Sequence, residues 1–400
     1  MIRDTLITFY LLCYKIFFNL FKLFPLKDKV TFVITFGDNS KYVYDEIKKQ
    51  KRPVDIVVLY KGKSSAYFTS HNDVTLIPLD TFNIFDFFRR IFHLATSKYI
   101  LIDNYFGFLA ATNFKSGVEC IQLWHASGAI KKFGAEDISV EKRSKRAQER
   151  FFRVYKNFHK VIVGSDIMAD IFKSAFNISD ENILRSGIPR TDFFYNNEIQ
   201  HNMIEKLIEG NSALKNKKKI LYAPTYRDQQ LDHFQMELEL DKMFDELGPN
   251  YIVLLRLHPA IKHVSNYSEL YPGFVYDYSS SIYDINDLLI ISDYLITDYS
   301  SIPYEFSLLN KPMIFFAYDL NTYKKERGLW DDYENMVPGP VVKKTVDIIN
   351  LIKENQFDLE QVRNYAGKWN KYSTGNSSEK LVKYMFEKDS FAVRAKGHYK

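Results

Sequence analysis

The sequence predicts two doubly wound α/β domains, each built on a mostly parallel sheet. Short runs of β-branched and other apolar residues alternate with helical stretches along most of the 400 residues. Several runs are apolar almost throughout, as parallel strands are when helices cover both faces of their sheet. A polar stretch at 209–219 interrupts the alternation once, after which it resumes. Two successive βα series predict two domains with a cleft between them.

The strands of both series can be placed by their apolar runs. The first series has predicted strands at 30–36, 55–60, 74–79, 98–103, 119–124 and 160–165. The second has them at 220–225, 251–257, 273–278, 293–298 and 312–318. We place the N-terminal domain at 28–210, the C-terminal domain at 211–372 and a C-terminal helix or tail at 373–400. Ligands of such sheets gather beyond the carboxyl ends of the strands, so each polar cluster after a strand is a candidate site.

Residues 1–27 are predicted to form an amphipathic, membrane-associating helix, with Pro25 as its stop signal. At about 100° per residue the polar residues form one stripe, which consists of Asp4, Thr8, Lys15, Asn19 and Lys22. These interruptions argue against a secretory signal and against a spanning helix. We expect a monotopic helix in the membrane interface, aided against anionic lipid by Lys27, Lys29 and the basic cluster at 48–52. The alternative is a helix packed on the core of the protein itself.

Charge and missing motifs narrow the function. Lys plus Arg exceed Asp plus Glu by 54 − 49 = 5, which suits an anionic substrate or membrane surface and is no nucleic-acid signature. Cys13 and Cys120 match no metal or redox spacing, which indicates a reducing, cytosolic setting. Without a Walker loop, a GxGxxG turn or a nucleophile elbow, P-loop hydrolysis, hydride transfer and serine hydrolysis become unfavoured. A basic segment at 140–160 is predicted to be helical, and either a solvated face or a lipid or phosphate contact explains it.

The first candidate cluster follows the predicted strand at 119–124 and contains His125, Ser127, Gly128 and Lys131. Histidine can accept a proton near neutral pH, and a lysine here could meet phosphate. Small residues let backbone N–H groups approach a ligand, and Gly128 tolerates a positive φ. On its own, a histidine at a strand end is as compatible with a structural role as with catalysis.

Two further clusters follow strands of the second series. Thr225, Arg227 and Asp228 offer contacts to phosphate, although an Arg–Asp surface pair at a turn is the alternative. Arg256 and His258 are two residues apart, so we expect them to point to the same side of their strand. Two such groups call for an anion, which a ligand or a structural carboxylate could supply.

The fourth cluster ends the strand at 293–298 and opens a helix. Thr297 and Asp298 complete the strand, and Ser300 and Ser301 precede a helix with Pro303 in its first turn. The free N–H groups of a helix start can bind an anion, and the hydroxyls could extend that site. Helix capping alone would also explain the two serines, but not the aspartate.

Taken in order, these motifs resemble the CDP-glycerol glycerophosphotransferase family of teichoic acid and capsule synthesis. The resemblance spans about Lys98 to about Val342 and rests on Trp124-His125 with Gly128 and Lys131, Tyr222-Ala223-Pro224-Thr225 with Arg227-Asp228, Arg256-x-His258-Pro259, Ile296-Thr297-Asp298-Tyr299-Ser300-Ser301, and the segments 310–323, 327–334 and 338–340. The fold of that family is GT-B, two Rossmann-like domains facing a cleft, which agrees with the two series of strands.

The resemblance implies transfer of glycerol phosphate from the donor CDP-glycerol to an acceptor hydroxyl, with release of CMP. It implies His125 as the general base, and Thr225, Arg227, Arg256, His258, Ser300 and Ser301 around the pyrophosphate, with Asp298 fixing the loop. The expected catalytic residues are therefore His125 and His258. The expected substrate-binding residues are Ser127, Gly128, Lys131, Thr225, Arg227, Arg256, Thr297, Asp298, Ser300 and Ser301. We expect neither a metal site nor a cofactor besides the donor substrate.

The loop at 125–131 favours one branch of the family. It reads His-Ala-Ser-Gly-Ala-Ile-Lys, whereas polymerising members tend to show His-Gly-Thr-Pro-Leu-Lys. This form resembles the primases, which add the first glycerol phosphate to an undecaprenyl-pyrophosphate-linked disaccharide (ManNAc-GlcNAc) in wall teichoic acid synthesis. A poly(glycerol phosphate) polymerase, a ribitol-phosphate transferase and a non-catalytic membrane-bound scaffold are the alternatives.

These readings also set the expected location and partners. We expect a peripheral, monotopic protein at the cytoplasmic face of the cell membrane, in contact with an anionic lipid surface. Homo-oligomers or contacts with other teichoic acid enzymes are possible partners, and nucleic acid is not expected.

Overall fold

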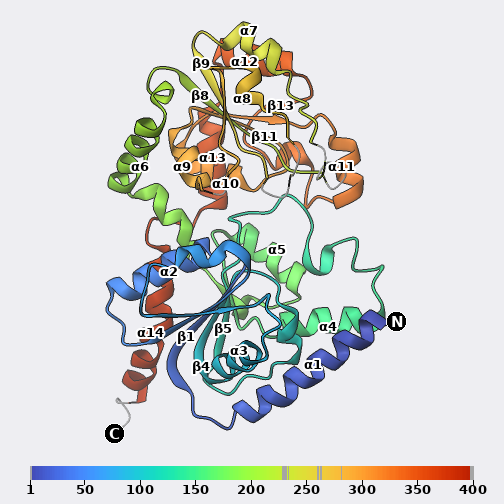
Figure 1. The fold of residues 1–400 in the computed structure, drawn as a ribbon, viewed down its shortest axis with the longest axis vertical. Coiled ribbons are helices and arrows are strands. Elements are labelled where there is room, and N and C mark those ends of the chain that lie inside the picture. Colours follow the sequence, from blue (N-terminus) through green and yellow to red (C-terminus); the bar gives the residue numbers. More distant parts are fainter. Residues whose placement is uncertain are drawn as a thin grey trace. The chain divides into compact units, whose positions relative to one another are not determined.

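The computed structural model describes residues 2–227, 232, 234–258, 261, 264–280 and 282–396 (Figure 1). The chain forms two compact α/β units. Unit 1 comprises Met1–His125, Phe133–Asp192 and Tyr372–Lys400, and unit 2 comprises Ala126–Lys132 and Phe193–Lys371. The chain therefore changes unit four times, and one of these changes falls directly after His125.

Unit 1 is built on a seven-stranded parallel sheet with the order β3-β2-β1-β4-β5-β6-β7. Its strands are β1 (Lys27–Ile34), β2 (Asp55–Tyr60), β3 (Val74–Pro78), β4 (Ser97–Ile102), β5 (Glu119–Gln122), β6 (Lys160–Ile162) and β7 (Ile183–Leu184). The first six lie on the predicted runs. The seventh has only two residues, and so short a strand leaves no run of apolar residues to recognise.

Helices cover both faces of this sheet (Figure 1). α2 (Asp38–Lys49) and α14 (Ser377–Lys396) pack on the face formed by Val30, Phe32 and Ile34 of β1, in one buried cluster. α3 (Ile84–Thr96) covers the other face, and α1 (Ile2–Phe21) packs on α3. The remaining helices are α4 (Lys145–Tyr155) and α5 (Asp166–Phe176). Because α14 belongs to unit 1, the C-terminal segment crosses back to the N-terminal sheet.

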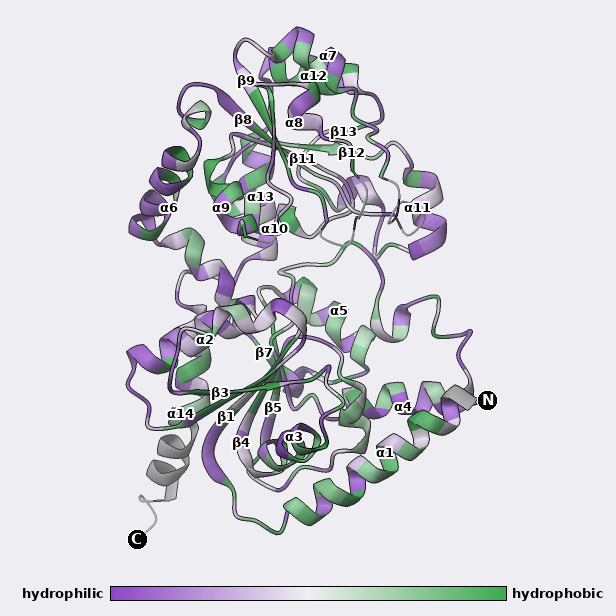
Figure 2. Ribbon diagram, in the orientation of Figure 1, coloured by the Kyte–Doolittle hydropathy of each residue, from purple (hydrophilic) through white to green (hydrophobic). Residues whose placement is uncertain are grey.

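α1 packs on the protein with one of its sides and leaves apolar residues exposed on the other, and its predicted membrane association stays a prediction. Tyr14 and Phe18 are buried, and Phe17 packs edge-on against Phe88 of α3 with ring centroids 4.7 Å apart. Leu6, Leu12 and other apolar residues of the opposite side stay exposed. Figure 2 shows green, hydrophobic positions along much of the α1 ribbon. By length and composition alone, the stretch Asp4–Phe21 could cross a membrane.

One expectation about lipid-facing lysines is wrong. Lys29 is 2% exposed, and its Nζ donates to Thr96 Oγ1 at 2.7 Å and lies 3.3 Å from His93 Nδ1. It points to the α3 face because side chains alternate along β1, which the sequence alone could not orient. Burial lowers the pKa of Lys29 to about 8. The basic cluster at 48–52 comprises the end of α2 and the residues just after it, on the opposite face of the sheet from α1 and α3.

Unit 2 is built on a six-stranded parallel sheet with the order β10-β9-β8-β11-β12-β13. Its strands are β8 (Lys218–Ala223), β9 (Tyr251–Leu255), β10 (Val275–Asp277), β11 (Tyr294–Thr297), β12 (Met313–Phe316) and β13 (Val341–Val342). Its helices are α6 (Asn197–Gly210), α7 (Leu240–Leu247), α8 (Tyr267–Leu270), α9 (Ile285–Ile291), α10 (Ile302–Phe306), α11 (Leu320–Arg327), α12 (Thr345–Glu354) and α13 (Leu359–Trp369). Two parallel-sheet α/β units confirm the predicted fold class.

Strand order explains why clusters far apart in the sequence meet in unit 2. β9, β8 and β11 are direct neighbours in the sheet, although they are separated along the chain. All of them are parallel, so their carboxyl ends lie at one edge. Each is followed by one of the predicted clusters.

Candidate active site

His125 lies just beyond β5, and its ring is held on three sides. Its Nδ1 lies 3.0 Å from the backbone carbonyl oxygen of Asp103, which follows β4. Phe36 stacks on the ring at 4.3 Å, and Trp124 lies against it at the same centroid distance. A carbonyl oxygen only accepts hydrogen bonds, so this contact places the proton on Nδ1 and the basic lone pair on Nε2.

Asp103 organises the backbone beside this histidine. The residue is 1% exposed, and its carboxylate accepts from the backbone N–H groups of Thr35, Phe36 and Gly37 at 2.8–3.2 Å. Burial raises the pKa of Asp103 to about 6, although these three N–H donors oppose the rise. The carboxylate thereby fixes the turn after β1, and the same residue offers its carbonyl oxygen to His125.

The backbone at Trp124 is strained. Trp124 has a φ of 55°, a left-handed conformation that bulky residues rarely adopt. Asn39 Nδ2 donates to the Trp124 carbonyl at 3.0 Å, and Gln122 Oε1 accepts from the Trp124 N–H at 2.8 Å. Arg190 Nη1 donates to the His125 carbonyl at 2.9 Å. These bonds overdetermine the turn, so His125 is presented on a rigid corner.

The segment after His125 belongs to unit 2. Ser127 is fully buried, and its hydroxyl donates to Glu305 Oε1 at 2.7 Å. The hydroxyl thus holds the segment to α10. A Cβ at Gly128 would lie 2.4–2.5 Å from ring atoms of Tyr304, so close approach makes glycine necessary. Gly128 does not use the positive φ that glycine tolerates, because its φ lies outside that range.

Lys131 lies near the end of this segment and pairs with Leu329 in an antiparallel bridge. The neighbouring Lys132 N–H donates to the Gly328 carbonyl at 3.2 Å, and Trp330 N–H donates to the Ile130 carbonyl at 3.1 Å. These backbone bonds fix the end of the segment within unit 2.

The ends of β8 and β11 are tied together by Asp298. This aspartate is 2% exposed, and its Oδ1 accepts from the backbone N–H groups of Thr225 at 2.7 Å and Tyr299 at 2.6 Å. Its Oδ2 accepts from Arg227 Nη2 at 3.0 Å. Burial raises the pKa of Asp298, while the Arg227 charge and the Thr225 hydrogen bonds oppose the rise. Thr297 adds a further link, since its hydroxyl donates to the Ala223 carbonyl at 2.6 Å.

Arg227 is engaged by two carboxylates and three aromatic rings. Besides Asp298, it contacts Asp319 through Nε at 2.7 Å and Nη2 at 3.0 Å. Its guanidinium lies 4.9–5.5 Å from the ring centroids of Tyr299, Tyr318 and Tyr323. The Arg–Asp pairing considered from the sequence therefore exists, but it is buried and made with Asp298 and Asp319. Asp228 itself lies outside the described residues.

Arg256 and His258 follow β9 and make contacts on its two flanks. Arg256 Nη1 donates to the carbonyls of Tyr278 and Ser280, beyond β10, at 2.6 and 2.7 Å. The His258 ring lies 4.5 Å from that of Tyr226, beyond β8. Regular strand geometry ends at Leu255, and Leu257 between the two residues is buried while His258 is exposed. Pro259 lies outside the described residues.

Cationic groups nevertheless surround His258. Burial lowers its pKa below the usual range, and the charges of Lys131 and Arg256 lower it further. Within unit 2, the segment after His125 thus brings Lys131 into electrostatic range of the β9 cluster. Such a grouping of positive charge is the electrostatic environment that an anionic ligand fits.

The fourth cluster also has the expected order. Ser300 Oγ accepts from the Ile302 N–H at 3.2 Å, and α10 begins at Ile302 with Pro303 in its first turn. Ser301 precedes the helix without capping it through its side chain. α10 has only five residues, so its dipole is smaller than that of the helix we expected. The side-chain hydrogen bond at the start of this helix therefore comes from Ser300, although Ser301 occupies the N-cap position.

The sequence analysis missed three residues of this site. They are Asn39, Asp103 and Arg190, which hold the turn at His125. The signal for two of them was present, because Asp103 ends a predicted strand and Asn39 follows another within a few residues. Arg190 sits between strands and helices in a 3-10 segment (Pro189–Tyr195), where no pattern singled it out. Among the described residues, no group of three or more His, Cys, Asp or Glu side chains is placed to hold a metal ion.

Two Rossmann-like units, one bearing an oriented histidine and the other a cationic group at its strand ends, define a GT-B transferase for an anionic donor. Residues 16–387 match the family described as CDP-glycerol:poly(glycerophosphate) glycerophosphotransferase, and the chain belongs to that family. The resemblance inferred from the motifs is thereby confirmed.

Individual relatives agree with this assignment. The chain is 36% identical to the teichoic acid glycerol-phosphate primase of Bacillus subtilis (strain 168), over 90% of this chain and 92% of the relative. It is 33% identical to the teichoic acid poly(ribitol-phosphate) polymerase of Bacillus spizizenii, over 91% of this chain and 57% of that protein. A solved structure of the wall teichoic acid polymerase TagF shares the fold, with a TM-score of 0.78, 23% identity and coverage of 97% of this chain and 98% of that chain.

Proposed function

We propose that this protein is a teichoic acid glycerol-phosphate primase. It transfers one glycerol phosphate from CDP-glycerol to an undecaprenyl-pyrophosphate-linked disaccharide and releases CMP. Family membership and the identity to a primase over nearly its whole length support this reading. The structural observation that carries it is the oriented His125, because a defined basic nitrogen is what an acceptor hydroxyl requires.

His125 acts as the general base in this proposal. Nε2 takes the proton of the acceptor hydroxyl as that oxygen attacks the phosphorus that carries glycerol. The bond from this phosphorus to the bridging oxygen breaks, and CMP leaves with the electron pair. The hydrogen bond from Nδ1 to the Asp103 carbonyl keeps the ring in this tautomer and stabilises the imidazolium that forms.

The cationic group of unit 2 holds the donor. Lys131, Arg256 and His258 offset the charge of the pyrophosphate and the charge that develops on CMP. Ser300 and Ser301 supply hydroxyls beside the start of α10. Asp298 and Arg227 hold the loops after β8 and β11 in place, because they contact each other and residues of the neighbouring loops.

The acceptor is proposed to reach the enzyme at the cytoplasmic membrane face. The exposed apolar side of α1 supports this placement, because large contiguous apolar surface is rare on soluble proteins unless it meets a partner or a membrane. The protein would then be peripheral, with α1 lying in the interface while its other side packs on α3.

The test is a count of transferred units. Purified protein is incubated with CDP-glycerol and a synthetic lipid-linked disaccharide, and both CMP release and product masses are measured. One added unit supports priming. A ladder of products, or a preference for CDP-ribitol, would replace the primase by a polymerase or a ribitol-phosphate transferase, and donor binding without CMP release would indicate a scaffold.

His125→Asn tests the proposed base. Asn retains an N–H donor for the Asp103 carbonyl but has no basic nitrogen. We expect kcat to fall about 10²–10⁴-fold, the usual contribution of general base catalysis, with little change in the KM for CDP-glycerol. Wild-type turnover in this variant would remove His125 from the mechanism.

A further inference from the structure

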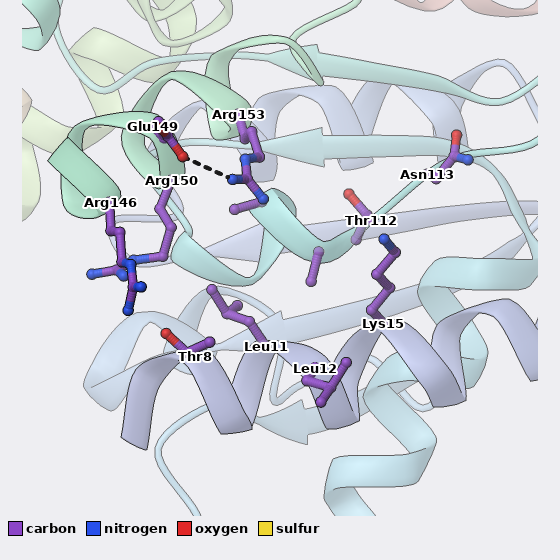
Figure 3. A pocket seen from close by; sticks show the side chains of 12 residues that line it. Thr8, Leu11, Leu12, Lys15, Thr112, Asn113, Arg146, Glu149, Arg150 and Arg153 are labelled. Atoms are coloured by element: carbon purple, nitrogen blue, oxygen red, sulfur yellow. Dashed lines mark hydrogen bonds and ion pairs between the residues drawn. The ribbon is translucent and has the colours of Figure 1, made fainter. Parts of the chain in front are cut away.

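A recess in unit 1 is lined by α1, by α4 and by the 3-10 segment η2 (Gly107–Ala111) with the residues that follow it. It has a volume of about 520 Å³ and is open to solvent on one side. Figure 3 shows Arg146, Arg150 and Arg153 extending from α4 and Lys15 from α1. Two hydroxyl-bearing side chains, Thr8 and Thr112, complete its polar part. Nothing in the proposed catalytic chemistry uses this recess.

The recess carries an excess of positive charge. Four cationic side chains line it, against one carboxylate, Glu149. Glu149 pairs with Arg153 at 3.3 Å, and Asp4 pairs with Arg150 at 2.6 Å. Lys15 and Arg146 make no ion pair with any side chain that the structure describes. Two uncompensated cations beside two paired ones favour an anion with several oxygens.

Three of these cationic side chains lie on one side of α4. Arg146, Arg150 and Arg153 are four and three residues apart, so they share one face of the helix. The face points to α1, as Arg150 and its partner Asp4 show. The polar stripe predicted for α1 therefore faces the recess, because Asp4, Thr8 and Lys15 all belong to it.

Exposed apolar surface adjoins the recess. The outer side of α1 presents Leu6, Phe9, Leu12, Ile16 and Leu20, each 51–65% exposed. α3 packs beside α1, and its first two residues, Ile84 and Phe85, are 57% and 75% exposed. Phe82, just before this helix, is 107% exposed. Leu12 belongs to both surfaces, since it also lines the recess. An anion bound here would therefore sit at the border of an apolar surface.

We propose that this recess binds the phosphate group of a membrane lipid. The inference rests on the proposed placement of α1 in the membrane interface. A membrane lipid carries an anionic phosphate next to apolar chains. The recess offers Arg and Lys side chains without an ion-pair partner in the described part of the chain to the phosphate, and the adjoining apolar surface lies where the chains would be. Two lipids present this chemistry, an anionic phospholipid and the polyprenyl carrier of the acceptor.

The recess variant is Lys15→Gln with Arg146→Gln. Both side chains are exposed and unpaired among the described residues, so their loss should leave the fold intact. The matched control is Lys142→Gln with Lys145→Gln, which removes the same charge from exposed positions of the same segment outside the recess. Lys15→Arg with Arg146→Lys keeps the charge and should retain binding. Circular dichroism confirms the fold of each protein.

Binding is measured by flotation with vesicles of phosphatidylcholine alone or with one added anionic lipid. The added lipid is phosphatidylglycerol, undecaprenyl phosphate or, as a phosphate-free anion, oleate at matched surface charge. We expect the recess variant to lose about 30-fold in affinity for at least one phosphate lipid, because each cation near the surface contributes about fivefold. The control should lose less than about threefold, and neither should differ on oleate vesicles beyond that range.

The outcomes separate the sources and the alternatives. A loss confined to undecaprenyl phosphate assigns the carrier lipid, and a loss with phosphatidylglycerol assigns a phospholipid. Equal losses in recess variant and control, equal losses on oleate, or equally tight binding of inorganic phosphate without vesicles would overturn the proposal. CMP release with a soluble acceptor analogue, measured on the same variants, should stay at the wild-type rate. If the wild-type protein released no CMP in this assay, the proposed function would be refuted instead.

Discussion

Replacing Arg227 by Met tests whether this arginine supports the loops of unit 2 through buried ion pairs. Met has a similar length and can pack against the same tyrosine rings, so the change removes mainly the charge. It leaves two carboxylates without their cation, Asp298 at 2% exposure and Asp319 at 23%. Removing one partner of a buried ion pair costs about 3–5 kcal/mol. Asp298 keeps the N–H groups of Thr225 and Tyr299, so we expect about 3 kcal/mol rather than the upper value.

The deficit should depend on pH in a defined direction. Burial already raises the pKa of Asp298, and Arg227 is the largest opposing influence. In the variant the folded-state pKa therefore lies further above the unfolded value. A carboxyl of this kind binds more protons when folded, so stability rises as pH falls toward the folded pKa. Adding Asp298→Asn should recover part of the stability at neutral pH and remove this pH dependence.

The assay is urea unfolding at about pH 7.5 and about pH 5.5, which lie above the unfolded pKa of a carboxyl. A Trp124→Phe background leaves Trp330 and Trp369, both in unit 2, as fluorescence reporters of that unit. If Arg227→Met lowered the free energy of unfolding by less than about 1 kcal/mol, the ion pair would contribute no more than a solvent-exposed one does. The reasoning would equally fail if the Asp298→Asn double variant were no more stable than Arg227→Met.

Three further predictions concern other sites. Burial and the charges of Lys131 and Arg256 keep the pKa of His258 low, so binding of an anionic donor should favour the protonated form of His258. Calorimetry in buffers of different ionisation enthalpy should therefore show proton uptake when CDP-glycerol binds, and binding should be tighter at lower pH. Neither effect should be seen in His258→Asn. Gly128→Ala should cost about 1–3 kcal/mol by overlap with Tyr304, and Tyr304→Leu should cost less in the Gly128→Ala background than alone, in a double-mutant cycle of urea unfolding. The pKa of Lys29 is about 8 in the folded protein, below its value in the unfolded chain. The free energy of unfolding of the wild type, relative to that of Lys29→Met, should therefore rise between about pH 8 and pH 10. A difference that does not change with pH would mean that Lys29 is not desolvated.

The fold was predictable because its signals are local and repeated. β2 coincides with its apolar run at 55–60, and the runs of the other long strands differ from the observed bounds by a few residues. β7 and β13 escaped because two residues carry no periodicity. The alternation of side chains along β1 was visible in the sequence, but not which side faces α3. Lys29 was for this reason assigned to lipid although it is buried.

The site was predictable in position and less so in detail. Strand-end rules located His125, the β9 cluster and Asp298, because chemistry gathers at one edge of a parallel sheet whatever the sequence between the strands. Partners could not be predicted, since a partner depends on which strands are neighbours. Asp319 pairs with Arg227 across 92 residues of chain, and Glu305 with Ser127 across 178. The side to which the polar stripe of α1 points could not be predicted for the same reason. Periodicity located the stripe, but only the position of α4 shows that the stripe faces the protein.

The contacts divide the cations of unit 2 into two kinds, and this division bears on catalysis. Arg227 is matched by carboxylates and aromatic rings, so bringing an anion to it would require breaking those contacts. Lys131, Arg256 and His258 instead oppose one another, as the lowered pKa of His258 records. In the proposed mechanism, an anionic donor would bind beside these three groups, and its leaving group would meet positive charge that is already positioned. The pairs of Arg227 with Asp298 and Asp319 would serve this mechanism by fixing the loops after β8 and β11.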